Sequence, residues 1–304
     1  MMNGIINVYK EKGYTSHDVV AKLRGILKQK KIGHTGTLDP QAEGVLPVCI
    51  GNATKLCDLL TDKTKEYEAV LLLGVTTDTQ DTTGAVLSEE SVQVEEDKLR
   101  AIMEGFVGKS RQIPPMYSAL KVNGKKLYEL AREGKEVERK PRDIEIFSLD
   151  ILEMQLPRVR FCVHCSKGTY IRTLCQDIGE KAGCGGCMEE LLRTRVDRFS
   201  LAEAHKLSEI EQIRDAGKLS EILIPVDQMF LSYPKVTVLA KYQLALANGN
   251  SLTAQMLAGA EDVTAQIHNG ALVRVYSAED VFYGIYQYTQ AEERFIPYKM
   301  FLPQ

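Results

Sequence analysis

The segment that most constrains this chain is the glycine-dense run from Gly33 to Gly44, which reads GHTGTLDPQAEG. Its glycines and Pro40 predict a tight loop with exposed backbone rather than a helix or a strand. Proline fixes its own φ and restricts the residue before it, so Asp39 presents its carboxylate from a rigid turn. The run lacks the Gly-Lys-Ser/Thr of a phosphate-binding loop, which argues against a nucleotide triphosphate site. An Asp before Pro is usually a turn former, so the loop alone assigns no chemistry.

Regular elements are predicted before this loop. The apolar run Gly4–Lys10 indicates a strand. Thr15, followed three residues later by Asp18, resembles a helix capping box. Apolar residues then recur at helical spacing, at Val19, Val20, Leu23, Ile26 and Leu27. Lysine favours a helix C-terminus and glycine ends a helix, so this helix should end near Lys28–Lys31 and Gly33.

Strand and helix patterns alternate irregularly over the following residues. An apolar stretch spans 45–50. Strands are predicted at 66–74, 144–152 and 159–166, and helices at 94–106, 128–132 and 169–181. A polar turn rich in Thr and Asp spans 78–84. This order favours an α+β domain built on a largely antiparallel mixed sheet over a doubly wound parallel sheet.

The pattern changes near residue 230, which predicts domains at 1–229 and 230–304. Ser232–Pro234 is typical of a linker. Beyond it, strand patterns at 270–276 and 281–288 and the turn dipeptides Asn248-Gly249 and Asn269-Gly270 indicate a small β-rich domain. A unit of this size can hold a modest core of its own.

Charge is distributed unevenly along the chain, although the net charge is only −3. Residues 1–31 hold seven Lys/Arg against two acidic residues, and residues 124–142 hold seven against four. Residues 78–104 carry eight acidic and two basic residues. This asymmetry suits a basic face on an acidic body, and it permits an RNA-binding face without proving one.

The seven cysteines argue against a disulfide framework, because their number is odd and the chain is long. Cys162–Cys165 and Cys184–Cys187 have the spacing of zinc ligands. However, Cys162 and Cys165 fall on opposite faces of a predicted strand, so buried free thiols are the preferred interpretation. With no apolar leader and no membrane-length apolar run, we expect a cytoplasmic protein.

The sequence from Gly33 to Pro40, continuing through Gly44-Val-Leu-Pro47, resembles the catalytic signature of the TruB family of pseudouridine synthases. Four further segments resemble family motifs in the same order, and together the five cover about residues 4–199. They are Lys65-Glu-Tyr-Glu-Ala69, Pro115–Tyr128, Cys165–Leu174 and Leu191-Leu-Arg-Thr194. The family implies isomerisation of one uridine, at position 55 in the T-loop of tRNA, without a cofactor or a metal.

The resemblance also implies catalytic roles. Asp39 would be the essential carboxylate, acting either as a nucleophile or as a base at the sugar. Tyr67 would stack on the target base and take part in proton handling. Arg172 would pair with Asp39 and hold it ionised. Without the motifs, a core strand position for Tyr67 and a surface helix position for Arg172 would be the preferred interpretations.

Five further residues are implied to bind substrate. Leu191 would form the apolar floor of the pocket, and His34 would occupy the space that the extruded nucleotide vacates. Lys10, Lys121 and Tyr170 complete the set, which comes from the matching motifs. Where the family commonly has Lys-Pro, this chain has Lys10-Glu11, so a less rigid turn is expected there.

The same resemblance implies an RNA-binding insertion at about 110–140 and, more loosely, a PUA-type RNA-binding domain at 230–304. The T-arm of tRNA would be the partner of a monomer that needs no other protein. Three alternatives compete with this interpretation. They are a relative that works within a guide-RNA particle, a non-catalytic protein that binds and remodels tRNA, and a zinc-dependent deaminase. The length, the catalytic motifs and the missing Pro-Cys-x-x-Cys respectively disfavour them.

Overall fold

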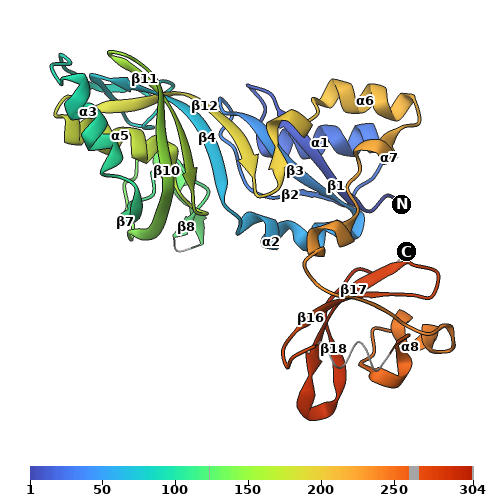
Figure 1. The fold of residues 1–304 in the computed structure, drawn as a ribbon. Helices are drawn as coiled ribbons and strands as arrows, with labels where there is room; N and C mark the ends of the chain where they lie inside the picture. The colour runs from blue at the N-terminus through green and yellow to red at the C-terminus, as the bar shows by residue number, and fades with distance from the viewer. Residues whose placement is uncertain (123, 260–266, 303–304) are drawn as a thin grey trace.

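The computed structural model describes residues 1–122, 124–259 and 267–302. Two units are visible in Figure 1, a large one carrying the N-terminus and a smaller β-rich one carrying the C-terminus. Asn123, within the predicted family segment at 115–128, lies outside the described residues. No helix in the described ranges combines the length and the apolar character needed to cross a membrane.

The elements of the large unit begin with β1 at Gly4–Lys10. Its other strands are β2 (Ile32–His34), β3 (Glu43–Ile50), β4 (Lys65–Leu73), β5 (Val75–Thr77), β6 (Val86–Glu89), β7 (Gly108–Gln112), β8 (Lys121–Val122), β9 (Lys125–Lys126), β10 (Arg142–Gln155), β11 (Arg158–Cys165), β12 (Gly186–Val196) and β13 (Phe199–Ser200). Its helices are α1 (Ser16–Leu27), η1 (Gly51–Leu56), α2 (Cys57–Thr61), α3 (Glu96–Glu104), α4 (Leu127–Arg132), α5 (Ile171–Ala182), η2 (Leu201–Glu203), α6 (Leu207–Asp215), α7 (Leu219–Ile222) and η3 (Val226–Phe230).

A nine-stranded sheet forms the centre of this unit, with the order β1-β3-β12-β4-β11-β10-β7 and with β2 and β13 attached to β3 and β12. All of its pairings are antiparallel except β3 with β12. Helices α1 and α6 pack on the β1–β3 half, and α3 and α5 pack on the β4–β10 half (Figure 1). The predicted α+β class with a largely antiparallel mixed sheet is therefore confirmed.

Helix α1 begins where the capping box predicts and ends at the start of the predicted basic patch Lys28–Lys31. Thr15 and Asp18 exchange both capping hydrogen bonds, and the apolar residues of the helix face the core. The last helical residue is Leu27, and the C-cap residue Lys28 adopts the left-handed conformation with φ of 48°. Gly33 plays no part in ending the helix, because the non-glycine residue Lys28 takes the position that favours glycine.

The catalytic-signature loop is shorter than predicted, because its ends belong to strands. Gly33 and His34 lie in β2, and Gly44 lies in β3. Cross-strand pairing of β2 with β3 therefore confines the free loop to residues 35–42, with Asp39 near its middle. Helix α5 likewise starts two residues later than predicted, and Tyr170 is its N-terminal capping position.

We expect Gly44→Ala to destabilise the protein by at least about 2 kcal/mol, because it combines a backbone clash with backbone strain. Gly44 has φ of +105°, and a Cβ there would lie 2.2 Å from the carbonyl oxygen of Arg193 on the neighbouring strand. Gly108 is the matched control, since its φ is +110° but nothing lies within 4 Å of its Cβ position. Thermal or denaturant unfolding should show a clearly larger loss for Gly44→Ala. Equal losses would show that the clash contributes nothing.

The C-terminal unit is a five-stranded sheet of order β14-β16-β17-β18-β15. Its elements are β14 (Lys235–Thr237), η4 (Ala240–Tyr242), α8 (Gln243–Ala247), β15 (Leu252–Thr253), η5 (Ala254–Met256), β16 (Leu272–Tyr276), β17 (Phe282–Thr289), η6 (Gln290–Glu292) and β18 (Arg294–Met300). The predicted β-rich, PUA-like unit is thus confirmed. Its Asn-Gly dipeptides do not make hairpins, however, since Asn248 ends α8 and Asn269-Gly270 precedes β16.

An apolar cluster joins the two units. Phe230 of η3 stacks near Phe282 and Phe301 of the C-terminal unit, with ring centroids 6.4 and 6.0 Å away. Asn52 and Lys55 of η1 add hydrogen bonds to the carbonyl oxygens of Phe301 and Met300, at 2.9 and 2.8 Å. The junction between the two units is therefore held by aromatic packing and hydrogen bonds, and it is more than a free linker.

Candidate active site

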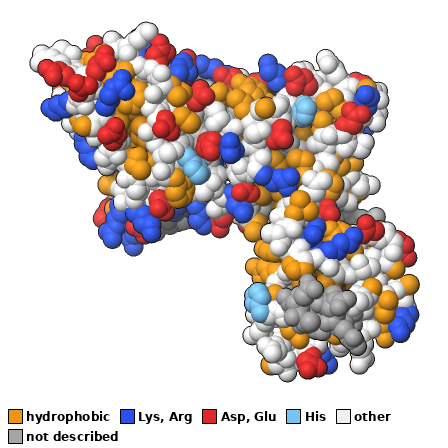
Figure 2. Space-filling view, in the orientation of Figure 1, with side chains coloured by type: hydrophobic (Ala, Val, Ile, Leu, Met, Phe, Trp, Pro, Cys, Tyr) orange, Lys and Arg blue, Asp and Glu red, His pale blue; other side chains and the backbone are white. Residues whose placement is uncertain are grey.

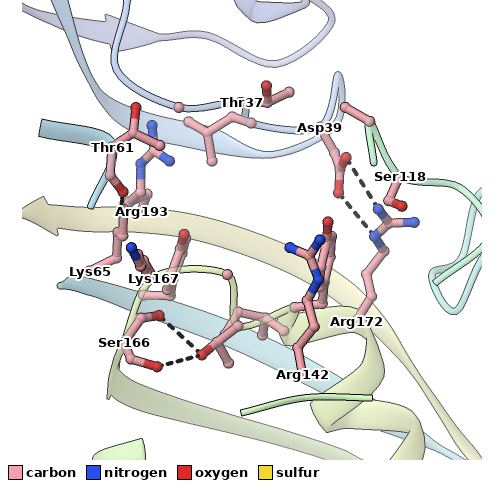
Figure 3. Close-up of a pocket in the computed structure, with 18 of the residues that line it drawn as sticks. Thr37, Asp39, Thr61, Lys65, Ser118, Arg142, Ser166, Lys167, Arg172 and Arg193 are labelled. Atoms are coloured by element: carbon pink, nitrogen blue, oxygen red, sulfur yellow. Dashed lines mark hydrogen bonds and ion pairs between the residues drawn. The ribbon is translucent and has the colours of Figure 1, made fainter. Parts of the chain in front are cut away.

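A cavity of about 600 Å³ opens beside the loop that carries Asp39. Its walls come from the 36–39 loop, the strands β4 and β12, the 118–120 segment and the start of α5. Figure 3 shows Asp39 and Arg172 facing each other at one end, while Arg193, Lys65 and Lys167 gather at the other. Segments far apart in the sequence thus meet around one space large enough for a nucleoside.

Asp39 and Arg172 form a two-pronged ion pair. The Nε atom of Arg172 lies 2.9 Å from Oδ2 of Asp39, and Nη2 lies 3.3 Å from Oδ1. Arg172 is only 5% exposed, whereas Asp39 keeps 38% of its side chain open to the cavity. The fork geometry of guanidinium against carboxylate fixes the direction of the Asp39 oxygens as well as their charge.

The guanidinium of Arg172 is itself held from three sides. It donates to the carbonyl oxygens of Thr79 at 3.0 Å and of Tyr117 at 2.8 Å. A second carboxylate, that of Asp81, lies 3.9 Å from its Nε atom and is 15% exposed. The polar 78–84 turn predicted from composition therefore supports the Asp39–Arg172 ion pair.

The environment raises the pKa of Asp39 above its ordinary value. Burial is the largest cause, and the negative charge of Asp81 adds to it, while Arg172 and Lys10 lower the pKa. Arg172 acts in the direction that the motif implied. Burial and the charge of Asp81 outweigh the lowering of the pKa by Arg172 and Lys10, so the Asp39 carboxylate is a stronger base than an ordinary aspartate.

Tyr67 lies directly opposite Arg193 in the antiparallel pairing of β4 with β12. Tyr67 is 9% exposed, and burial raises the pKa of its phenol, while the guanidinium of Arg193 opposes that rise. The phenol therefore keeps its proton, and its ring forms part of the cavity wall. This placement is both a core strand position and a site position, so the two interpretations of Tyr67 are not exclusive.

Arg193 is a site residue to which the motif gave no role. It is 1% exposed, and its Nε atom donates to the carbonyl oxygen of Val45 at 2.7 Å. Its Nη2 atom is buried and has no hydrogen-bond partner among the described residues. The sequence spacing could have pointed to Arg193, because residues two apart on a strand share a face and Leu191 was already expected to line the pocket. Only the cross-strand pairing shows that this face meets Tyr67.

Lys65 is the second cation at this end of the cavity. Burial and the nearby Arg193 charge lower the pKa of Lys65 to about 8. Its ammonium donates to the carbonyl oxygens of Thr61 and Lys63 at 2.6 and 2.5 Å. These bonds hold the turn from α2 into β4, so Lys65 shapes the wall of the cavity next to Tyr67.

Two of the predicted substrate-binding residues line the cavity. Leu191 contributes apolar surface from β12 and packs against the core of the large unit. Tyr170 sits at the start of α5, where its main chain exchanges hydrogen bonds of 2.8 and 3.0 Å with the side chain of Gln112. Burial raises the pKa of the Tyr170 phenol, which therefore stays protonated.

Lys10, His34 and Lys121 lie outside the cavity lining formed by the described residues. Lys10 is fully buried, and its ammonium donates to the carbonyl oxygens of Ala42 at 2.6 Å and of Pro40 at 3.2 Å. It therefore positions the Asp39 loop from beneath, while the substrate contact expected of Lys10 stays a prediction. His34 bonds its ring to the Gly36 carbonyl oxygen at 3.0 Å, and Lys121 is exposed on β8.

Cys162 and Cys165 have the sequence spacing of zinc ligands, but the strand that carries them separates their side chains. Cys162 and Cys165 lie on opposite faces of β11, with Cys165 buried and Cys162 partly exposed. Within the described parts of the chain, no three His, Cys, Asp or Glu side chains converge on one point as metal ligands would.

Known proteins resemble this chain along its whole length. Residues 24–171 match the TruB family pseudouridylate synthase N-terminal domain, and residues 172–231 match the tRNA pseudouridylate synthase B C-terminal domain. The tRNA pseudouridine synthase B of Lachnoclostridium phytofermentans is 57% identical, covering 99% of this chain and 100% of the relative. That of Clostridium kluyveri is 44% identical, covering 93% and 95% respectively.

Solved structures agree with this assignment. A chain in a structure titled as an H/ACA RNP bound to a substrate RNA containing 2'-deoxyuridine has a TM-score of 0.70 and 27% identity, covering 99% of this chain and 85% of that one. A chain in a Cbf5-Nop10-Gar1 complex also has a TM-score of 0.70, at 29% identity and with the same coverage. The motif order, the fold and these similarities together show that this chain belongs to the TruB family of pseudouridylate synthases.

Proposed function

We propose that this protein isomerises uridine to pseudouridine at position 55 in the T-loop of tRNA. The observation that carries the proposal is the Asp39–Arg172 ion pair at the mouth of a nucleoside-sized cavity floored by Tyr67. The relatives that cover almost the whole chain bear the name tRNA pseudouridine synthase B, which supports tRNA as the substrate.

The proposed reaction detaches uracil from its ribose, rotates it and rejoins it through carbon. Asp39 initiates cleavage of the glycosidic bond, either as a nucleophile or as a base at the sugar. The uridine must leave its stack to reach the cavity, which costs a few kcal/mol. Stacking on an aromatic face such as that of Tyr67 returns about 1–3 kcal/mol. Leu191 and Tyr170 complete the binding wall in this proposal.

Tritium release from tRNA carrying labelled uridine, combined with chemical mapping of pseudouridine, tests the proposal directly. We expect conversion of the single T-loop uridine, and none in a tRNA whose position 55 carries another base. Tight tRNA binding without any conversion would instead support the alternative, a non-catalytic protein that binds and remodels tRNA.

The proposed RNA face uses basic residues from the 1–31 and 121–142 segments. Figure 2 shows Lys and Arg side chains gathered along the lower edge of the large unit, near the ends of β7 and β8. Lys121 and Lys125 of this region are exposed. His34 would act within the bound complex, since it lies on the β2 edge of the Asp39 loop.

We expect tRNA binding to weaken steeply with salt, because phosphate contacts release counterions; six to ten such contacts would cost roughly 10³-fold or more between 50 and 200 mM. Lys121→Ala with Lys125→Ala should weaken binding at low salt and flatten the slope of log Kd against log salt. Arg100→Ala, an exposed change on α3 in the acidic segment, is the matched control and should leave the slope unchanged. A flat salt response of the unmodified protein would argue against this face.

The remaining parts of the proposal concern organisation. We place a catalytic domain at 1–229, with its RNA-binding insertion at about 110–140, and a PUA-like domain at 230–304. The protein acts as a cytoplasmic monomer without a required protein partner. Support for the two-domain division comes from the separate sheets of the two units.

A further inference from the structure

Two cysteines outside the active site, Cys49 and Cys57, lie in the same apolar cluster. Cys49 is in β3, and Cys57 begins α2 just after the 3-10 turn η1. Gly33 of β2 is the direct cross-strand partner of Cys49. The Cys57 sulfur lies 3.1 Å from the point where a Cβ on Gly33 would be. Directly opposed residues place their Cβ atoms about 4.5–5.5 Å apart on one face, so the Cys57 sulfur fills the place of the missing Gly33 side chain, beside Cys49.

The two thiols lie in different environments, and each shifts the pKa of the other. The Cys49 thiol is fully buried, and the neighbouring Cys57 thiol together with burial raises its pKa. Cys57 is partly exposed, and the neighbouring Cys49 thiol lowers its pKa, with a smaller contribution from Lys299 of the C-terminal unit and opposition from burial and Asp58. Because the thiolate is the reactive form, Cys57 is the nucleophile of the pair, and Cys49 is the second, buried thiol that can react with the oxidised Cys57.

Other cysteines lack this combination of features. Cys162 is also partly exposed, but burial and the charges of Glu66, Glu68 and Asp150 raise its pKa. Cys175 is fully buried on α5, and burial raises its pKa as well. Reactivity should therefore concentrate at Cys57.

We propose that Cys49 and Cys57 are a peroxide-sensitive pair that closes reversibly into a disulfide. The Cys57 thiolate attacks a peroxide oxygen, giving a sulfenic acid and releasing the other oxygen as hydroxide or alkoxide. The Cys49 sulfur then attacks the sulfenic sulfur, forming the S–S bond and releasing water with the Cys49 proton. Two electrons pass from the two thiols to one peroxide. A cellular thiol restores the pair by exchange.

Formation of the disulfide would affect the junction between the large unit and the C-terminal unit. The segment between the two cysteines contains Asn52 and Lys55, which hold the carbonyl oxygens of Phe301 and Met300 in the C-terminal unit. Forming the bond brings the two sulfurs to about 2.05 Å. The first turn of α2 must move toward β3, so the bond acts on the surface against which the C-terminal unit packs.

The test is peptide mapping by mass spectrometry of the full-length protein after brief treatment with hydrogen peroxide. We expect a Cys49–Cys57 cross-linked peptide, 2 Da lighter than the reduced pair, which dithiothreitol removes. Before oxidation, iodoacetamide at neutral pH should modify Cys57 at least about tenfold faster than Cys162, in line with its larger thiolate fraction.

Cys57→Ser should abolish the cross-link without affecting tRNA modification, because Cys57 lies outside the active site. Cys162→Ser is the matched control, a partly exposed thiol on the separate strand β11, and should leave the cross-link intact. The proposal fails if Cys57 is oxidised to the sulfinic acid without a cross-link, if a different pair forms, or if Cys57 does not react. These three outcomes concern the cysteines alone and do not depend on the proposed catalytic function.

Discussion

Asparagine at position 39 is expected to lower the rate of pseudouridine formation by more than about 100-fold, the scale of losing an essential acid–base or nucleophilic group. The amide has nearly the shape of the carboxylate, and 38% of the side chain faces the cavity, so the fold should tolerate it. It can neither attack the nucleotide nor accept a proton. Affinity for tRNA should stay within a few-fold, because phosphate contacts elsewhere dominate binding.

Single-turnover assays of Asp39→Asn beside the unmodified protein measure this effect. Asp62→Asn is a suitable control, since Asp62 also lines the cavity but is exposed and pairs with Lys167 at 2.9 Å. It should retain most of the activity. Asp39→Asn activity above about one hundredth of the unmodified level would remove Asp39 from the centre of the mechanism.

Replacing Arg172 by glutamine is expected to have the second largest effect, a loss of roughly 100-fold in the rate of pseudouridine formation at neutral pH. The guanidinium both supplies the positive charge beside Asp39 and orients its carboxylate, and glutamine does neither. Arg172 lowers the pKa of Asp39, while burial and Asp81 raise it. Without Arg172 the pKa of Asp39 rises further, so a smaller fraction is ionised at a given pH. The acid limb of the kcat/KM profile should therefore move to higher pH, and part of the loss should be recovered as pH increases.

The shape of the profile separates this role from a purely structural one. Arg172 also holds the carbonyl oxygens of Thr79 and Tyr117, so thermal unfolding of Arg172→Gln must be measured alongside. Arg172→Lys keeps the positive charge and loses the fork. Its acid limb should stay closer to that of the unmodified protein, with a reduced maximum. An acid limb that does not move in Arg172→Gln would mean that the pair orients Asp39 without tuning its ionisation.

Local patterns in the sequence were sufficient for much of the fold. The capping box at Thr15 and Asp18 depends on residues three apart, and the structure contains both of its hydrogen bonds. The strands β1, β4 and β11 were predicted to within a residue or two, because alternation and apolar runs report directly on burial. The approach of Arg172 to Asp39 came from the family motifs, since nothing local links residues 133 positions apart.

Tertiary structure decided the features in which a side chain finds a partner from a distant element. The motifs place Lys10 among the substrate-binding residues, and nothing in the sequence shows that its buried ammonium donates to three carbonyl oxygens beneath the Asp39 loop. Arg193 meets Tyr67 only through the β4–β12 register, and Cys57 meets Cys49 only because Gly33 leaves space between β2 and α2. Short-range periodicity determines which face of an element is buried. Which charge, thiol or ring it meets there depends on strand order and register, and these are set by contacts across the whole chain.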